Sequence, residues 1–148
     1  MTANKHLSNI HYVLDTDTIT YQQRGDATVL QRLSQINPDH VATTVVSMYE
    51  QLRGRLARIN RKQNDKSLQL AYQRLQATHA YYCKIHVLPF DDAAATLHRQ
   101  LVKQKVRIGA QDLKIAAITL ANQAILVTSN RRHFDKVPNL QIEDWTLS

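Results

Sequence analysis

Glycine, proline and cysteine are scarce in this chain of 148 residues, and each scarcity excludes a class of protein. Three glycines and three prolines argue against a low-complexity or disordered chain. The single cysteine, Cys83, excludes an internal disulfide, and its aromatic neighbours predict a buried or half-buried filler residue. No apolar run approaches the roughly 18 residues that a membrane span needs. Residues 1–10 are polar and lack the apolar core of a signal peptide, so we expect a cytoplasmic protein without a membrane segment.

Acidic residues are also in the minority, with 12 Asp and Glu against 19 Lys and Arg, which gives a formal net charge of +7. An excess of positive charge favours polyanionic partners. Two segments, residues 51–63 and 98–107, contain several cations and no acid. A solvated helix face explains either segment alone about equally well. Two such segments, in a chain whose few acids fall at motif positions, favour a nucleic-acid partner.

The hydrophobic residues, 43% of the chain, follow strand-like and helix-like patterns in alternation. Short apolar runs predict strands at residues 11–14, 41–43, 85–88, 124–128 and 140–142. Strands that alternate with helices predict parallel pairing and a three-layer α/β/α sandwich around a mainly parallel central sheet. No internal repeat interrupts the pattern, so we expect residues 1–148 to form one domain.

Two of the predicted helices bear on function. A first helix, which runs toward Arg24, would be capped by Asp17 or Thr18. A longer helix would begin near residues 44–47 and carry the first basic segment on its polar faces. Its apolar spacing of three and four residues predicts a buried face, made of Tyr49, Leu52, Leu56 and Ile59.

Three acids are candidates for a functional site: one follows a predicted strand, and two lie on predicted helices with apolar faces. Asp15 follows the first predicted strand, and with Asp17 two residues later it suits a hard divalent cation. A turn or a helix cap explains Asp15 at least as well. Glu50 lies at the edge of an apolar helix face and could simply flank it. Asp112 opens an apolar helix, where the helix dipole alone favours an acid.

Together with their surroundings, these acids resemble the PIN-domain nucleases, and within them the VapC-type toxins of bacterial toxin–antitoxin pairs. No single block of the resemblance is specific, but six blocks follow one another in the family's order and span nearly the whole chain. The blocks are residues 12–17, 43–54, 88–91, 108–117, 126–134 and 137–140, followed by Glu143-Asp144-Trp145.

The resemblance implies an endoribonuclease that depends on Mg²⁺ or Mn²⁺ and has an α/β/α fold. Its acidic pocket, which holds the metal, corresponds to Asp15, Glu50 and Asp112. Carboxylates crowded together repel one another, and a divalent cation removes that cost, binds the scissile phosphate and activates water. The expected reaction is therefore hydrolysis of an RNA phosphodiester.

The chain departs from the family at the fourth acid. Many members have an acid just after the strand that corresponds to residues 126–128, where this chain has Asn130. The Asn130 amide could hold a phosphate or a metal-bound water as part of the catalytic centre. Another acid is sometimes seen where this chain has His133, and Asp17 could partly restore the missing charge.

The basic residues and the resemblance together predict the partners. RNA phosphates would contact the basic segments, with Arg53, Arg58, Arg131 and Arg132 as the expected contacts. The resemblance also implies a cognate antitoxin that blocks the site, and a homodimer. The competing hypothesis is a catalytically weak or inactive RNA-binding module, which the net charge and Asn130 favour.

Overall fold

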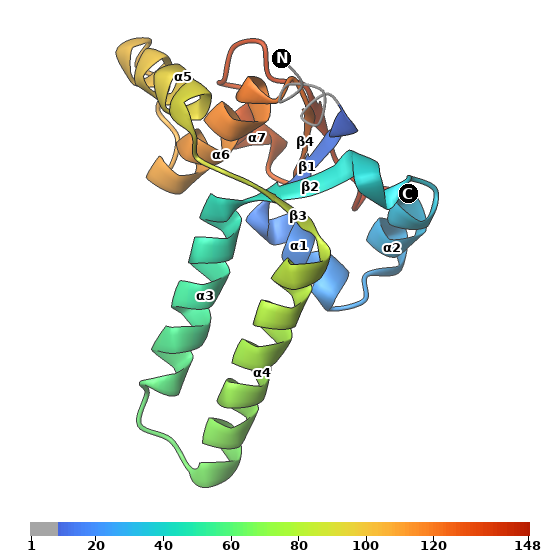
Figure 1. The fold of residues 1–148 in the computed structure, drawn as a ribbon, viewed down its shortest axis with the longest axis vertical. Coiled ribbons are helices and arrows are strands. Elements are labelled where there is room, and N and C mark those ends of the chain that lie inside the picture. Colours follow the sequence, from blue (N-terminus) through green and yellow to red (C-terminus); the bar gives the residue numbers. More distant parts are fainter. Residues whose placement is uncertain (1–8) are drawn as a thin grey trace.

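The computed structural model describes residues 9–148 and contains one five-stranded sheet (Figure 1). All four strand pairings are parallel, in the order β3-β2-β1-β4-β5. The three-layer fold around a parallel sheet is therefore confirmed. The strands are β1 (Tyr12–Leu14), β2 (Val41–Thr44), β3 (His86–Leu88), β4 (Ile125–Val127) and β5 (Ile142–Glu143). The last strand was expected at residues 140–142 and lies slightly later.

Helices connect these strands. They are α1 (Thr16–Gln23), α2 (Ala27–Ser34), the 3-10 helix η3 (Pro38–His40), α3 (Val45–Ile59), α4 (Asp65–Lys84), α5 (Asp92–Lys103), α6 (Ala110–Ala121) and α7 (Arg131–Phe134). The predicted cap of α1 is wrong. Asp15, rather than Asp17 or Thr18, is the N-cap, because the chain turns from strand to helix immediately after Leu14.

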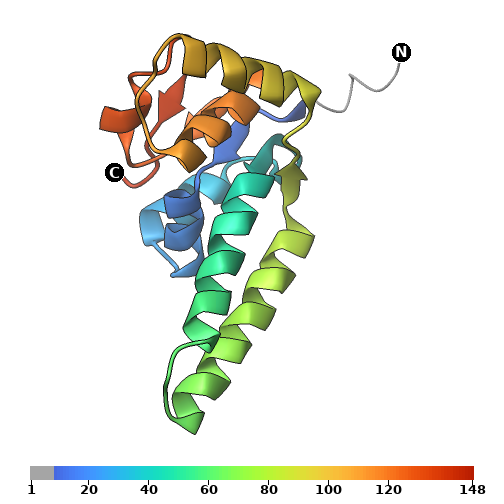
Figure 2. The same cartoon turned by 90° about the vertical axis from the view of Figure 1, so that its left-hand side faces the viewer.

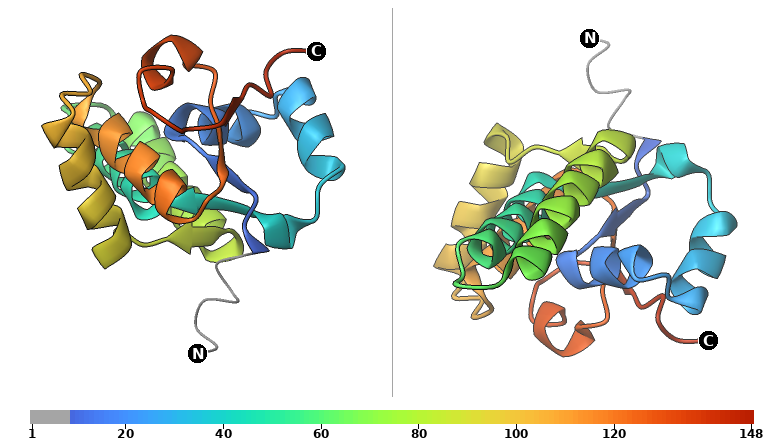
Figure 3. Two further views of the ribbon diagram at one scale, coloured as in Figure 1. Left: turned by 90° about the horizontal axis from the view of Figure 1, so that it is seen from above. Right: turned by 90° about the horizontal axis from the view of Figure 1, so that it is seen from below.

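Successive strand residues point to opposite faces of the sheet and so build two cores. Val13 and Leu126 belong to the core under α5 and α6, whereas the next residues, Leu14 and Val127, belong to the core under α1 and α2. Figure 3 shows these two helix pairs on opposite sides of the strands. Trp145, which is 1% exposed, closes the second core from the C-terminal segment.

Helices α3 and α4 form a long hairpin that extends away from the sheet (Figure 2). The predicted buried face of α3 is wrong for two of its members, because Tyr49 is 51% and Leu56 is 50% exposed. The residues of α3 that are buried are Val46, Ser47 and Gln51, near the sheet. Beyond the sheet, α3 has one neighbouring helix to cover it, so an apolar face that a globular core would bury stays partly open.

Two further predictions concern residues away from the site. Cys83 is exposed on α4, so its predicted role as a buried or half-buried filler is wrong. Within residues 9–148, none of the helices is both long and apolar enough to span a membrane.

Candidate active site

The carboxyl ends of β1, β2 and β4 meet at one edge of the parallel sheet, where polar side chains gather. Strand order reverses at β1, which pairs with β2 on one side and with β4 on the other. Ligands of open parallel sheets bind at such a switch point. The register pairs Leu14 with Val127, so the residues that follow them, Asp15 and Thr128, lie side by side.

Asp15 is buried, with 4% of its surface exposed, and two groups hold it in place. The Thr18 amide donates a 2.8 Å hydrogen bond to Asp15 Oδ1, and the Thr128 side chain also hydrogen-bonds to this carboxyl group. Burial raises the pKa of Asp15 to about 6 and the charge of Asp17 adds to the shift, whereas hydrogen bonding by Thr128 and by Thr18 opposes it. The helix-cap explanation is thus correct, but capping does not require burial of the carboxylate.

Glu50 reaches the same edge from the second turn of α3. That helix begins directly after β2, where the Thr44 hydroxyl accepts a 3.1 Å hydrogen bond from the Ser47 amide. The Thr16 hydroxyl donates a 2.6 Å hydrogen bond to Glu50 Oε1 and lies 3.0 Å from Ser47 Oγ. Glu50 is therefore oriented by the first residue of α1, next to Asp15.

Asp112 lies in the first turn of α6, after the N-cap Gly109, which makes no side-chain cap hydrogen bond. Its pKa is raised by burial first and then by the charges of Glu50 and Asp17, whereas His133 lowers it. These side chains, which come from α1, α3, α6 and α7, therefore share one electrostatic environment. Asp17 belongs to this environment through its exposed carboxylate and also raises the pKa of Asp15.

The segment after β4 adds a polar pair to the edge. The Asn130 amide nitrogen, Nδ2, lies 2.9 Å from His133 Nδ1, so the two side chains fix each other. The backbone amide of Asn130 donates a 2.9 Å hydrogen bond to the Thr128 hydroxyl. Arg131 and Arg132 are exposed beside this pair, and the Arg131 guanidinium donates to the Ile142 carbonyl oxygen at 3.3 Å.

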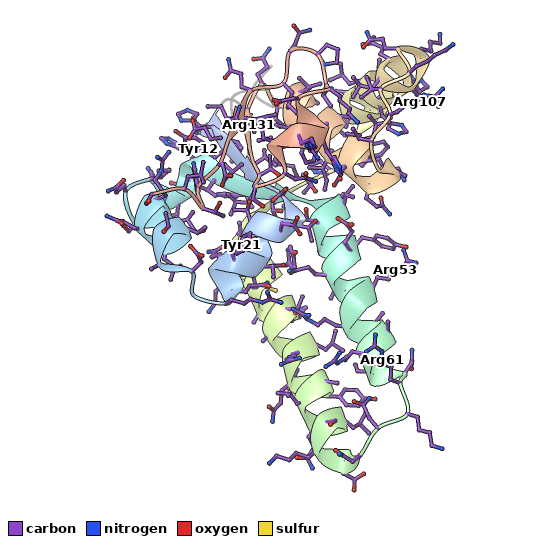
Figure 4. The ribbon with its side chains drawn as sticks, turned by 180° about the vertical axis from the view of Figure 1, so that it is seen from behind. Tyr12, Tyr21, Arg53, Arg61, Arg107 and Arg131 are labelled. Atoms are coloured by element: carbon purple, nitrogen blue, oxygen red, sulfur yellow. The ribbon has the colours of Figure 1, made fainter. Side chains whose placement is uncertain are left out.

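The two arginines of α3 that the sequence singled out lie on different sides of the helix. Arg53 is exposed on the side turned away from α4 (Figure 4). Arg58 lines a hollow between the end of α3 and the start of α4. The helix period of 3.6 residues separates the two side chains by about 140°, so they cannot contact the same phosphate group from one face.

Three hydroxyl residues of the site were missed by sequence reasoning. Thr16, Ser47 and Thr128 each position an acid or its neighbour. A local signal was present for Thr128, because it follows a buried strand that must lie in the same sheet as the strand before Asp15. No local signal joins Thr16 to Ser47, which is 31 residues away.

The donor chemistry of this edge fits a divalent cation. Carboxylate and hydroxyl oxygens are the ligands that Mg²⁺ and Mn²⁺ prefer, and a cation would offset the burial and mutual repulsion that raise the pKa values of Asp15 and Asp112. As placed, however, no three Asp, Glu, His or Cys side chains in residues 9–148 converge closely enough to enclose a metal ion. The acids are gathered at one edge but do not form a closed ligand cluster.

Comparison with known proteins agrees with this geometry. The model of the PIN domain family matches residues 12–140, which is most of the chain and contains Asp15, Asp17, Glu50 and Asp112. The chain therefore belongs to the PIN-domain family, whose VapC nucleases generally depend on a divalent metal.

Individual relatives that match the chain over most of its length are VapC proteins. The chain is 30% identical over 137 residues to Ribonuclease VapC1 of Haemophilus influenzae (strain R2866), covering 91% of this chain and 98% of that protein. It is 26% identical to the tRNA(fMet)-specific endonuclease VapC of Shigella flexneri, over 93% of this chain and 99% of that one. The structure of VapBC-1 from nontypeable Haemophilus influenzae superimposes with a TM-score of 0.73 and 26% identity, over 93% of this chain and 99% of that chain.

Proposed function

We propose that this chain is a divalent-metal-dependent endoribonuclease that acts as a VapC-type toxin and is inhibited by a cognate antitoxin. The observation that carries the proposal is the gathering of Asp15, Glu50 and Asp112 at the switch point of the sheet. Membership of the PIN-domain family and similarity to VapC ribonucleases over 91% of the chain support the same reaction.

Each residue at the edge has a distinct part in the proposed mechanism. Asp15, Glu50 and Asp112 would hold Mg²⁺ or Mn²⁺, which binds the scissile phosphate, activates water and neutralises developing charge. Thr16 orients Glu50, and Thr128 orients Asp15.

The segment after β4 would act on the substrate rather than on the metal. The Asn130 carboxamide, held by His133, binds a phosphate oxygen at the position where other family members have an acid. We expect Arg53, Arg58, Arg131 and Arg132 to contact the RNA phosphates that flank the cut.

The proposed partners are RNA, an antitoxin and a second copy of the chain. The VapBC-1 complex of Haemophilus influenzae is a close structural match, and we infer that this chain pairs with an antitoxin in the same way. Exposed apolar side chains on the hairpin, including Tyr49, Leu56 and Tyr72, offer such a partner surface to bury. We propose that the protein works in the cytoplasm as a homodimer.

A cleavage assay tests the reaction directly. Purified chain should cut structured RNA in the presence of Mg²⁺ or Mn²⁺ and should stop when the cation is chelated. The Asp15→Asn variant should fold but lose cleavage, and its expression should no longer slow growth as the wild-type chain does. A folded Asp15→Asn variant that stays equally active and toxic would rule out Asp15 as a metal ligand.

The second candidate is a catalytically weak or inactive RNA-binding module. Two observations favour it: Asn130 replaces an acid, and the carboxylates do not enclose a metal as placed. RNA binding without metal-dependent cleavage, at any concentration of Mg²⁺ or Mn²⁺, would support this candidate over the nuclease.

A further inference from the structure

The positive charge of the chain is concentrated on the α3–α4 hairpin. Residues 45–84 contain eight Lys and Arg and two acids, Glu50 and Asp65. The hairpin therefore carries a formal +6 of the chain's +7, while the rest of the chain is nearly neutral. In Figure 1 the tip of this hairpin lies at the opposite end of the molecule from α5, which contains the first part of the second basic segment.

Two hollows follow the seam between α3 and α4, and they share Arg74. The larger, about 630 Å³, begins at Thr16 and Glu50 and runs between α1 and the hairpin. The smaller, about 260 Å³, lies at the hairpin tip. The cations that line them come from three helices and the turn: Arg24, Arg55, Arg58, Arg61, Lys62 and Arg74. Glu50, at the catalytic end of the larger hollow, is the one acid among the residues that line the two hollows.

None of these six cations is neutralised by a neighbouring carboxylate. The ion pairs found among residues 9–148 are Arg32 with Glu143 and His86 with Asp39, both outside the seam. Arg55 is held in the seam instead by a 3.0 Å hydrogen bond from its Nε to the Thr78 hydroxyl, which leaves the rest of its guanidinium to bind a ligand. Unpaired cations along a groove are the arrangement that binds a phosphodiester backbone and releases its counterions.

The spacing along α3 relates the tip to the acids. Glu50 and Arg58, which lines the hollow at the tip, are eight residues apart on α3, so they lie about 12 Å apart along the helix axis. That distance corresponds to about three to four stacked nucleotides at 3.4 Å each. Gly54 lies between them in the wall of the larger hollow, and a Cβ there would meet nothing within 4 Å. The wall of the groove is therefore open at Gly54.

We propose that the α3–α4 seam is the track along which RNA runs away from the cut site, and that the hollow at the hairpin tip is a second phosphate-binding site. This inference rests on the proposed function and adds where the substrate lies. An acidic protein segment is the competing occupant. The seam favours RNA because its cations line both hollows, from the catalytic end to the hairpin tip, which suits a ligand with one charge per nucleotide.

The test measures binding of a labelled 20-nucleotide single-stranded RNA to the Asp15→Asn chain, which does not cut it, over a range of salt concentrations. In that background the tip variant carries Arg58→Gln, Arg61→Gln and Lys62→Gln. The comparison variant, called the α5 variant, loses the same charge from α5 and the loop after it through Arg99→Gln, Lys103→Gln and Arg107→Gln. The tip variant should bind about tenfold or more weakly, and its salt slope should flatten by about 2, since each phosphate contact on a single strand contributes about 0.7. The α5 variant should keep the slope.

A variant that keeps the charge tests whether RNA lies in the groove or is only attracted by the positive charge of the hairpin. Gly54→Leu fills the groove without removing charge, so it should weaken RNA binding while Gly54→Ala has a much smaller effect. Circular dichroism and thermal melting would verify that each variant folds. Equal losses of RNA binding in the tip and α5 variants would overturn the proposal. It would also be overturned if the tip variant bound RNA as before but bound a poly-glutamate peptide more weakly. Cleavage by the wild-type chain is scored separately: its absence would end the nuclease proposal while a flattened slope in the tip variant still supported the track.

Discussion

The Thr16 hydroxyl donates a 2.6 Å hydrogen bond to Glu50 Oε1 and thereby joins α1 to α3 across 34 residues of sequence. Thr16 directly follows Asp15, so the backbone that positions one acid also positions the group that holds the other. Asp15 directly follows β1, and Glu50 lies on the helix that directly follows β2. The residues at which these two strands end therefore determine where both acids lie.

Removing that hydrogen bond should impair catalysis more than binding. In Thr16→Val, Glu50 loses its charge-assisted hydrogen bond, which is worth about 1.5–3 kcal/mol, so kcat for RNA cleavage should fall by about 10- to 100-fold. KM should change little, because the RNA contacts remain. Thr16→Ser keeps the hydroxyl and should restore most of the rate. A serine variant as slow as the valine variant would show that the methyl packing of Thr16 matters rather than its hydroxyl.

Asp15→Asn should stabilise the metal-free protein at neutral pH. The pKa of Asp15 rises from 3.8 to about 6 on folding, so the folded state binds more protons than the unfolded state between those values. Stability should therefore fall as pH rises from about 4 to about 6 and then level off, with a total cost of about 3 kcal/mol. Urea unfolding across pH should show this loss in the wild type and a flatter profile in the variant.

A second N-cap aspartate provides the control for this substitution. Asp26 caps α2 through a 3.0 Å hydrogen bond from the Val29 amide, as Asp15 caps α1, but it is half-buried rather than buried. Asp26→Asn should leave the stability nearly unchanged. Added Mg²⁺ or Mn²⁺ should stabilise the wild type and not Asp15→Asn. Equal stabilisation of both would place the cation elsewhere.

Thr128→Val should shift the pH dependence of cleavage. The hydrogen bond from Thr128 lowers the pKa of Asp15, so its removal should raise that pKa further above about 6. Since the ionised carboxylate is the form that binds a cation, the acidic limb of the kcat/KM profile should move to higher pH. Thr128→Ser keeps the hydroxyl and should leave the limb in place. An unmoved limb in a folded valine variant would mean that another group controls it.

Gly54→Ala should raise the thermal stability of the protein. Glycine in an exposed helix interior costs about 0.5–1 kcal/mol relative to alanine, and the new Cβ would meet no atom within 4 Å. Gly25 is the matched control, because its Cβ would also lie in open space but its φ is +80°. Gly25→Ala should therefore lower the melting temperature measured by circular dichroism. A lower melting temperature in Gly54→Ala would show that α3 needs the glycine for close packing.

The local patterns of the chain were sufficient to predict the layers of the fold. Runs of apolar residues and spacings of three and four report directly on strands and helices, since both periods are properties of the local backbone. The alternation of the two therefore predicted a parallel sheet. The position of Asp15 at a strand end followed for the same reason, and the family resemblance supplied Glu50 and Asp112, which no spacing connects to it.

The tertiary structure decided the burial and the contacts that depend on elements distant in sequence. Tyr49 and Leu56 have a helical apolar spacing, yet they are half exposed, because no other element among residues 9–148 covers their side of α3. The contact of Thr16 with Glu50 and the meeting of Arg58 with Arg74 join residues that only the packing of α1, α3 and α4 brings together. Spacing along a chain reports which side of its own helix a residue occupies, but the burial and charge it meets there are set by elements distant in sequence.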